Sequence, residues 1–123
     1  MPYLLLAGLG GFVGTLCRYL LNIIIYEWLK YPTFPFATLL INVSGCFIIG
    51  LLSGLAETRL AFSPEWRVFI FIGILGGFTT FSTFGYETFN LVRDGQFFLG
   101  TLNIFLQVFL GLLAVWIGYG LTR

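Results

Sequence analysis

Four hydroxyl side chains and three phenylalanines follow a glycine pair in the run Gly76-Gly77-Phe78-Thr79-Thr80-Phe81-Ser82-Thr83-Phe84, in the middle of a long apolar segment. Adjacent glycines followed by β-branched threonines weaken a helix. In hydrocarbon, an unsatisfied backbone group costs several kcal/mol, so a broken helix must be buried in protein or line a cavity. The run therefore predicts a membrane helix that is broken partway, with loosened carbonyls and hydroxyls that could hold an ion.

The composition places the whole chain in a membrane. Of its 123 residues, 59% are hydrophobic and only 9% are charged, whereas a soluble domain carries roughly a quarter charged residues. We expect one all-α transmembrane domain over residues 1–123. The net charge of +1 offers no basic surface for nucleic acid, and the absence of histidine excludes histidine-based catalysis within this chain. No catalytic constellation is evident, so we do not expect an enzyme.

Polar breaks divide the chain into four predicted spans. They are residues 3–26, 34–56, 66–92 and 97–121. Each is near or above the ~20 residues that a helix needs to cross a bilayer. An even number of spans places both termini on one side of the membrane.

The flanking charges orient the chain only weakly. One predicted side holds Arg59, Arg67 and Arg123, and the other holds Lys30 and Arg93. Three positive charges against two is a feeble bias under the positive-inside rule. A chain this short also cannot easily wall a pore alone, which favours a homo-oligomer of oppositely oriented copies over a single fixed orientation.

Several polar side chains lie inside the apolar spans. A mid-membrane arginine costs roughly 2.5 to 3.5 kcal/mol on insertion scales, so Arg18 must face protein or water. It could concentrate anions in a vestibule or bond backbone carbonyls. Asn42 could hold helices together or donate its amide hydrogens to an anion. Asn103 and Gln107, four residues apart, form a polar stripe that suits packing and conduction about equally. Glu87 leaves a proton relay and a structural or gating role open.

The third span carries the elements of an anion site. If the residues after the break are helical, Phe78, Phe81 and Phe84 recur every third position and form one aromatic stripe. Aromatic rings have positive edges, and a hydroxyl donates one hydrogen bond, so ring edges beside Ser82 and Thr83 could replace the hydration shell of a compact anion. The alternative is a packing stripe whose hydroxyls bond their own helix.

Spacings of the Gly-x-x-x-Gly type also recur, and they indicate close helix contacts. They occur at Gly10/Gly14, Gly50/Gly54 and Gly73/Gly77.

Three motifs in order resemble the Fluc (CrcB) family of fluoride channels over essentially the whole chain. They are Gly10-Gly11-x-x-Gly14-x-x-x-Arg18-Tyr19, then Thr38-Leu-x-x-Asn42-x-x-Gly45-x-Phe47-x-x-Gly50, then the run from Gly76 to Phe84.

The resemblance implies an antiparallel, dual-topology homodimer in the inner membrane that passively exports fluoride through two pores. It implies a central structural Na⁺ held by the backbone carbonyls of Gly76 and Thr79. The implied fluoride pore comprises Asn42, Phe81, Ser82, Thr83, Phe84 and Arg18, with Asn103 and Gln107 in place of the polar track expected on the fourth helix.

Two other classes compete with this interpretation. A small multidrug-type, proton-coupled exporter also has four spans, but it needs a carboxylate in its first span, where this chain has Arg18 and no acid before Glu27. A non-transporting assembly subunit would explain the glycine spacings but not the hydroxyl and phenylalanine run.

Overall fold

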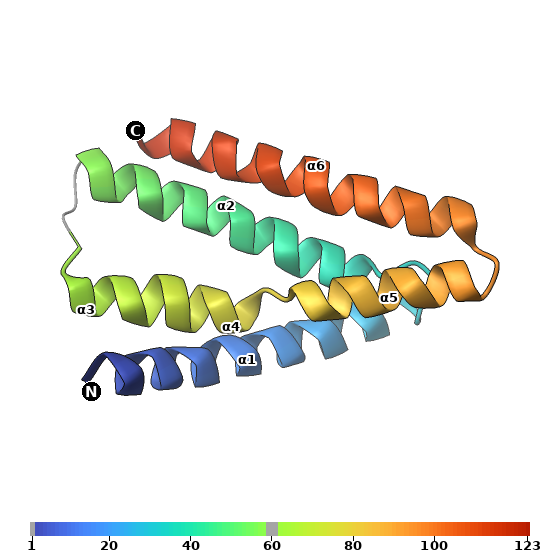
Figure 1. Ribbon diagram of the computed structural model, residues 1–123, viewed down its shortest axis with the longest axis horizontal. Helices are drawn as coiled ribbons and strands as arrows, with labels where there is room; N and C mark the ends of the chain where they lie inside the picture. Colours follow the sequence, from blue (N-terminus) through green and yellow to red (C-terminus); the bar gives the residue numbers. More distant parts are fainter. Residues whose placement is uncertain (1, 59–61) are drawn as a thin grey trace.

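The computed structural model describes residues 2–58 and 62–123, and within these ranges it consists of helices and short links. Four helical spans are long and apolar enough to cross a membrane in the described part: α1 (Pro2–Leu29), α2 (Phe36–Thr58), the compound third span Pro64–Arg93, and α6 (Phe97–Thr122). The four predicted spans are confirmed, although the first helix continues to Leu29. The start of α1 and the end of α6 lie at the same end of the bundle (Figure 1). Arg59 lies outside the described residues.

The third span is built of several pieces. They are α3 (Pro64–Arg67), the π-helical segment η1 (Val68–Leu75), α4 (Gly76–Phe78) and α5 (Phe81–Arg93). Figure 1 shows the chain drawn out between α4 and α5. The predicted break is confirmed, but it lies at Thr79 and Thr80 and not at the glycine pair.

The break falls at the threonines for a local reason. Gly76 keeps helical angles (φ −63°, ψ −37°), whereas Thr79 (φ −89°, ψ 158°) and Thr80 (φ −150°, ψ 126°) are extended. Two side-chain heavy atoms on the β-carbon make threonine favour an extended backbone. The predicted aromatic stripe is therefore split, because Phe78 belongs to α4 and is buried, while Phe81 and Phe84 belong to α5.

Glycine seams join the helices in two pairs. On one seam, α1 meets η1 and α4: a β-carbon on Gly10 would lie 2.8 Å from the Cα of Gly73, and one on Gly77 would lie 2.7 Å from the carbonyl oxygen of Gly11. Such distances leave no room for a side chain, which is the close backbone approach that small residues permit between membrane helices.

The second seam joins α2 to α6. A β-carbon on Gly50 would lie 3.0 Å from the Cα of Val115, and one on Gly54 would lie 2.8 Å from the carbonyl oxygen of Tyr119. The two seams account for the most extensive helix contacts in the described residues. The predicted glycine contacts are thus confirmed, and they leave the Thr79–Thr80 break facing the space between the two helix pairs.

Candidate functional site

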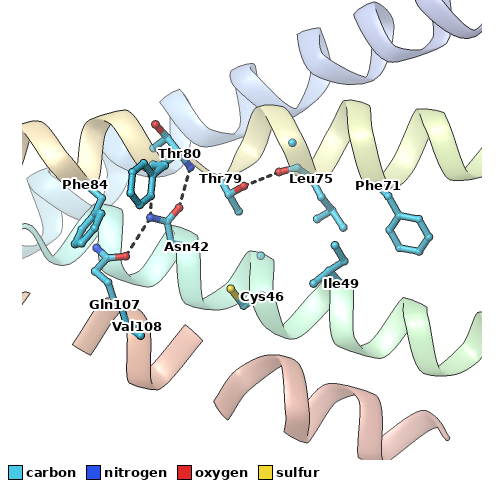
Figure 2. A pocket seen from close by; sticks show the side chains of 13 residues that line it. Asn42, Cys46, Ile49, Phe71, Leu75, Thr79, Thr80, Phe84, Gln107 and Val108 are labelled. Carbon is cyan, nitrogen blue, oxygen red and sulfur yellow. Dashed lines mark hydrogen bonds between the residues drawn. The ribbon is translucent and has the colours of Figure 1, made fainter. Parts of the chain in front are cut away.

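Asn42 of α2 pairs with the broken backbone like a neighbouring strand. The backbone N–H of Thr80 donates to Asn42 Oδ1 at 3.0 Å, and Asn42 Nδ2 donates to the carbonyl oxygen of Thr80 at 3.1 Å (Figure 2). Both polar backbone groups of Thr80 are thereby satisfied without water. One amide side chain thus offsets the several kcal/mol that an open backbone would cost in the membrane.

Hydroxyl groups cap the helix that follows the break. Thr80 Oγ1 accepts from the backbone N–H of Thr83 at 3.3 Å, which makes Thr80 the N-cap of α5. The same hydroxyl donates to Thr83 Oγ1 at 3.1 Å and lies 3.4 Å from Ser82 Oγ. Three hydroxyls are therefore concentrated at the first turn of α5, next to the positive end of the helix dipole.

Arg18 is attached to the other side of the break. Its Nε donates to the carbonyl oxygen of Gly77 at 2.9 Å, and the side chain is half-buried. The sequence left open whether Arg18 concentrates anions or bonds backbone carbonyls, and this geometry shows the bond to a backbone carbonyl. The cationic head remains beside the break, where it also adds positive potential.

Two amides of α6 extend the polar group around Asn42. Asn42 Nδ2 also donates to Gln107 Oε1 at 3.1 Å, and Gln107 Nε2 donates to Asn103 Oδ1 at 3.5 Å. Asn103 is 0% exposed, and its Nδ2 donates to Thr88 Oγ1 of α5 at 2.9 Å. A continuous chain of hydrogen bonds therefore runs from the break through α2 and α6 to the middle of α5.

A cavity of about 420 Å³ opens at the break. Its polar lining comes from Asn42, Thr79, Thr80 and Gln107, and the rest is mostly apolar. The rings of Phe81 and Phe84, which also line it, lie 5.6 Å apart between centroids at 57°. Phe81 is 83% exposed, so in a single chain one of these rings stands on the outer surface.

A second cavity, of about 360 Å³, lies along α5 beyond the break. Its lining includes Thr83, Glu87 and Asn90, and Glu87 Oε1 and Asn90 Oδ1 are buried without a hydrogen-bond partner among the described residues. Because Thr80 lines the first cavity and Thr83 the second, the hydrogen bond between their hydroxyls lies where the two cavities approach each other.

Two carbonyl oxygens lose their usual helical donors at the break. The N–H of Thr80, four residues after Gly76, is given to Asn42, and the N–H of Thr83, four residues after Thr79, is given to Thr80 Oγ1. A helix would otherwise use these N–H groups for the carbonyls of Gly76 and Thr79. Across residues 2–58 and 62–123, no group of three or more Cys, Asp and Glu side chains is placed to hold a metal. Carbonyl oxygens released from helical hydrogen bonds are ligands that suit Na⁺.

The structure brings most of the predicted site residues to the break. Asn42, Phe81, Phe84 and Gln107 line the first cavity, and Asn103 stands behind Gln107. The remaining predicted residues lie around the same point: Arg18, Gly76, Thr79, Ser82 and Thr83.

The sequence analysis does not single out Thr88, and it treats Thr80 and Gly77 only as members of the run whose hydroxyls and carbonyls could hold an ion, without the contacts that they make. A threonine directly before the apolar start of a helix is a common N-cap, so Thr80 carried a readable signal. Thr88 and Gly77 carried none, since their roles depend on contacts between distant segments.

Comparison with known proteins gives concordant matches. The family described as "CrcB-like protein, Camphor Resistance (CrcB)" matches residues 5–119. A protein of Solibacter usitatus named fluoride-specific ion channel FluC is 48% identical over 100% of this chain and 99% of its own length. Proteins of the same name from Geobacter sulfurreducens (46% identical, 100% of this chain and 98% of its own) and Elusimicrobium minutum (44%, 93% and 88%) are also similar. With the family matched over nearly the whole chain and relatives this similar, the chain belongs to the CrcB-like family.

Proposed function

We propose that this chain forms a fluoride-selective channel in the inner membrane and lets fluoride leave the cytoplasm down its electrochemical gradient. The observation that carries the proposal is the cavity at a helix break, lined by amide and hydroxyl groups beside a pair of phenylalanine rings. The chain also belongs to a family in which relatives similar to it are named fluoride-specific ion channels, and this supports the same function. A channel of this kind performs no covalent chemistry.

Selectivity follows from the size of the ion. Fluoride is small and strongly hydrated, so it enters a narrow site only where several donors and positive ring edges replace its water. Ser82 and Thr83 supply hydroxyls, and Phe81 and Phe84 supply ring edges. We expect the rings and donors to exclude a larger anion such as chloride by its size.

Both donor hydrogens of the Asn42 side chain are already engaged within the chain. Its two Nδ2 hydrogens are given to the Thr80 carbonyl and to Gln107 Oε1. The bond to Thr80 is one of a pair tied to the backbone, whereas Gln107 is a flexible side chain. Of the two contacts that Asn42 donates, the one to Gln107 is therefore the less constrained.

A second copy of this chain, oriented antiparallel, completes the site. Phe81 is 83% exposed in one chain, and the first cavity exposes amide and hydroxyl groups that lipid cannot satisfy. The nearly balanced flanking charges permit both orientations. Since both termini lie on one side, a direct linker between two copies forces a parallel pair, and a linker containing one extra membrane helix forces an antiparallel pair. We expect fluoride flux from the second tandem protein only, and flux from the first alone would refute the antiparallel pair.

The carbonyls of Gly76 and Thr79 would hold a structural Na⁺ where the two broken helices meet. Their usual helical donors are engaged elsewhere, and carbonyl oxygens suit this ion. The cation would hold the two breaks together and would not be transported. We expect a lower midpoint of thermal dissociation when Na⁺ is replaced by N-methylglucamine, and indifference to that exchange would count against the site.

Anion efflux from proteoliposomes tests the channel function directly. Purified protein is reconstituted in vesicles loaded with fluoride or chloride, and release is followed with ion-selective electrodes. We expect rapid fluoride release and chloride release at the rate of protein-free vesicles. Comparable release of both anions would end the proposal, and release of neither would favour the non-transporting class.

A further inference from the structure

The hydrogen-bond chain at the break has only one possible direction. A backbone N–H can only donate, so Asn42 must present Oδ1 to Thr80 and Nδ2 to Gln107. Gln107 must then accept with Oε1 and donate with Nε2 to Asn103, which in turn donates to Thr88 Oγ1. The single fixed donor at the break therefore orients both amides of α6.

The strengths of the links differ along this chain. The two contacts between Thr80 and Asn42, the contact between Asn42 and Gln107, and the contact between Asn103 and Thr88 measure 2.9 to 3.1 Å. The link from Gln107 to Asn103 is 3.5 Å, at the outer limit of a hydrogen bond. Gln107 is also half-buried at the cavity wall, whereas Asn103 is 0% exposed. Gln107 is thus the member that can move, with Asn103 and Thr88 as its anchor.

We propose that Gln107 Oε1 occupies the place of the anion on Asn42, and that the anchor of Asn103 and Thr88 determines how readily Gln107 yields. This inference rests on the proposed function, since the ligand that displaces Gln107 is fluoride. In the absence of the ion, Gln107 keeps the part-buried donor of Asn42 satisfied, which avoids the cost of leaving it unpaired. When fluoride enters, it must compete with that oxygen, so Gln107 sets the affinity of the site.

The proposal predicts tighter binding when the competitor is removed. In Gln107→Met, which keeps the length of the side chain but has no acceptor oxygen, fluoride should half-saturate the site at about two- to tenfold lower concentration, the size expected for one hydrogen bond. Thr88 does not line the first cavity, and Thr88→Val removes the hydroxyl at which the hydrogen-bond chain ends. This variant should lower the half-saturating concentration of fluoride by a smaller factor. Thr88→Ser keeps the hydroxyl and should restore the original value.

The measurement is the ¹⁵N–¹H signal of the Asn42 side-chain amide in lipid nanodiscs, titrated with sodium fluoride and, separately, with sodium chloride. The signal is assigned by its loss in Asn42→Asp. Thr101→Val, on the exposed face of α6, is the matched control and should leave the titration unchanged. A role in folding alone would weaken fluoride binding in Gln107→Met, so the direction of the change separates the two explanations.

Two results would overturn the inference. One is an Asn42 amide signal that is the same in Gln107→Met and in the original protein before any fluoride is added. The other is a half-saturating concentration that is unchanged or raised in Gln107→Met. If fluoride shifts no Asn42 signal in the original protein, the proposed function fails at this site, while the ion-free spectrum still tests whether Gln107 bonds Asn42.

Discussion

The glycine seam between α1 and α4 and the Thr79–Thr80 break are neighbours in the sequence, yet they solve opposite problems. At the seam, backbones meet with no room for a β-carbon, and most of the contact is backbone against backbone. At the break, the backbone is opened, and side chains from α1 and α2 satisfy it. The comparison indicates that the seam holds the helices together and that the break supplies the polar groups of the proposed ion site. Substitutions in the two regions should therefore fail in different ways.

The largest effect is expected from filling the seam. A β-carbon on Gly14 would lie 2.9 Å from the backbone N of Phe78 and from the carbonyl C of Ile74, so Gly14→Leu cannot be accommodated without separating α1 from α4. Overpacking costs typically 1–3 kcal/mol and occasionally more. We expect loss of the monodisperse peak in size-exclusion chromatography. Gly8→Leu, on the same helix, is the control and should behave normally, because a β-carbon at Gly8 would meet nothing within 4 Å. Equal behaviour of the two variants would contradict the assignment of the seam.

The next largest effect is expected from the paired phenylalanine rings, whose loss should abolish fluoride flux but leave the fold intact. Replacing both Phe81 and Phe84 with Ile keeps apolar bulk but removes the ring edges that the proposed route offers to fluoride. We expect fluoride efflux to fall to the level of protein-free vesicles while the elution volume stays unchanged. The matched control replaces Phe105 and Phe109 of α6, an exposed and stacked pair, with Ile and should conduct normally. Unchanged flux in the first variant would remove the rings from the mechanism.

Much of this comparison could be predicted from the sequence, because it depends on local composition. Apolar length gave the four spans, and Gly-x-x-x-Gly spacing gave both seams. The sequence places the break too close to Gly76, because glycine weakens a helix but does not by itself open it. Two factors favour the threonines: their β-branched side chains suit an extended backbone, and Asn42, far along the chain, pairs with the extended Thr80.

The remaining parts of the site depend on pairings that no local pattern encodes. The contact from Arg18 to Gly77 spans 59 positions, and the contact from Asn42 to Gln107 spans 65. The π-helical geometry of Val68–Leu75 likewise left no readable signal, since the segment is uniformly apolar. The residue types indicated which side chains were unusual in lipid, but only the packing of the two helix pairs showed which of them meet.

Arg18 offers a way to separate charge from geometry at the break. Its Nε, not its terminal nitrogens, donates to the Gly77 carbonyl, so Arg18→Lys keeps the charge but lacks a donor at that point on the side chain. We expect both Arg18→Lys and Arg18→Met to lose about 1.5–3 kcal/mol of stability, the range for a hydrogen bond to a charged group. Thermal unfolding in detergent measures this loss, with efflux recorded in parallel. A lysine variant that is stable and fully active would show that positive charge alone is needed.

The smallest effect should come from the N-cap of α5, and it tests how much the break contributes to the stability of the fold relative to the seam. Thr80→Val keeps the β-branched shape that favours the extended backbone but removes the hydroxyl that accepts from the N–H of Thr83. Loss of an N-cap costs about 0.5–2 kcal/mol. Because the pairing of Asn42 with the Thr80 backbone is untouched, we expect a folded channel with slightly lower thermal stability and reduced flux, and Thr80→Ser should recover both. If Thr80→Val matched the Gly14→Leu variant in severity, the break would be as important to the fold as the seam, and the division between the two regions would be wrong.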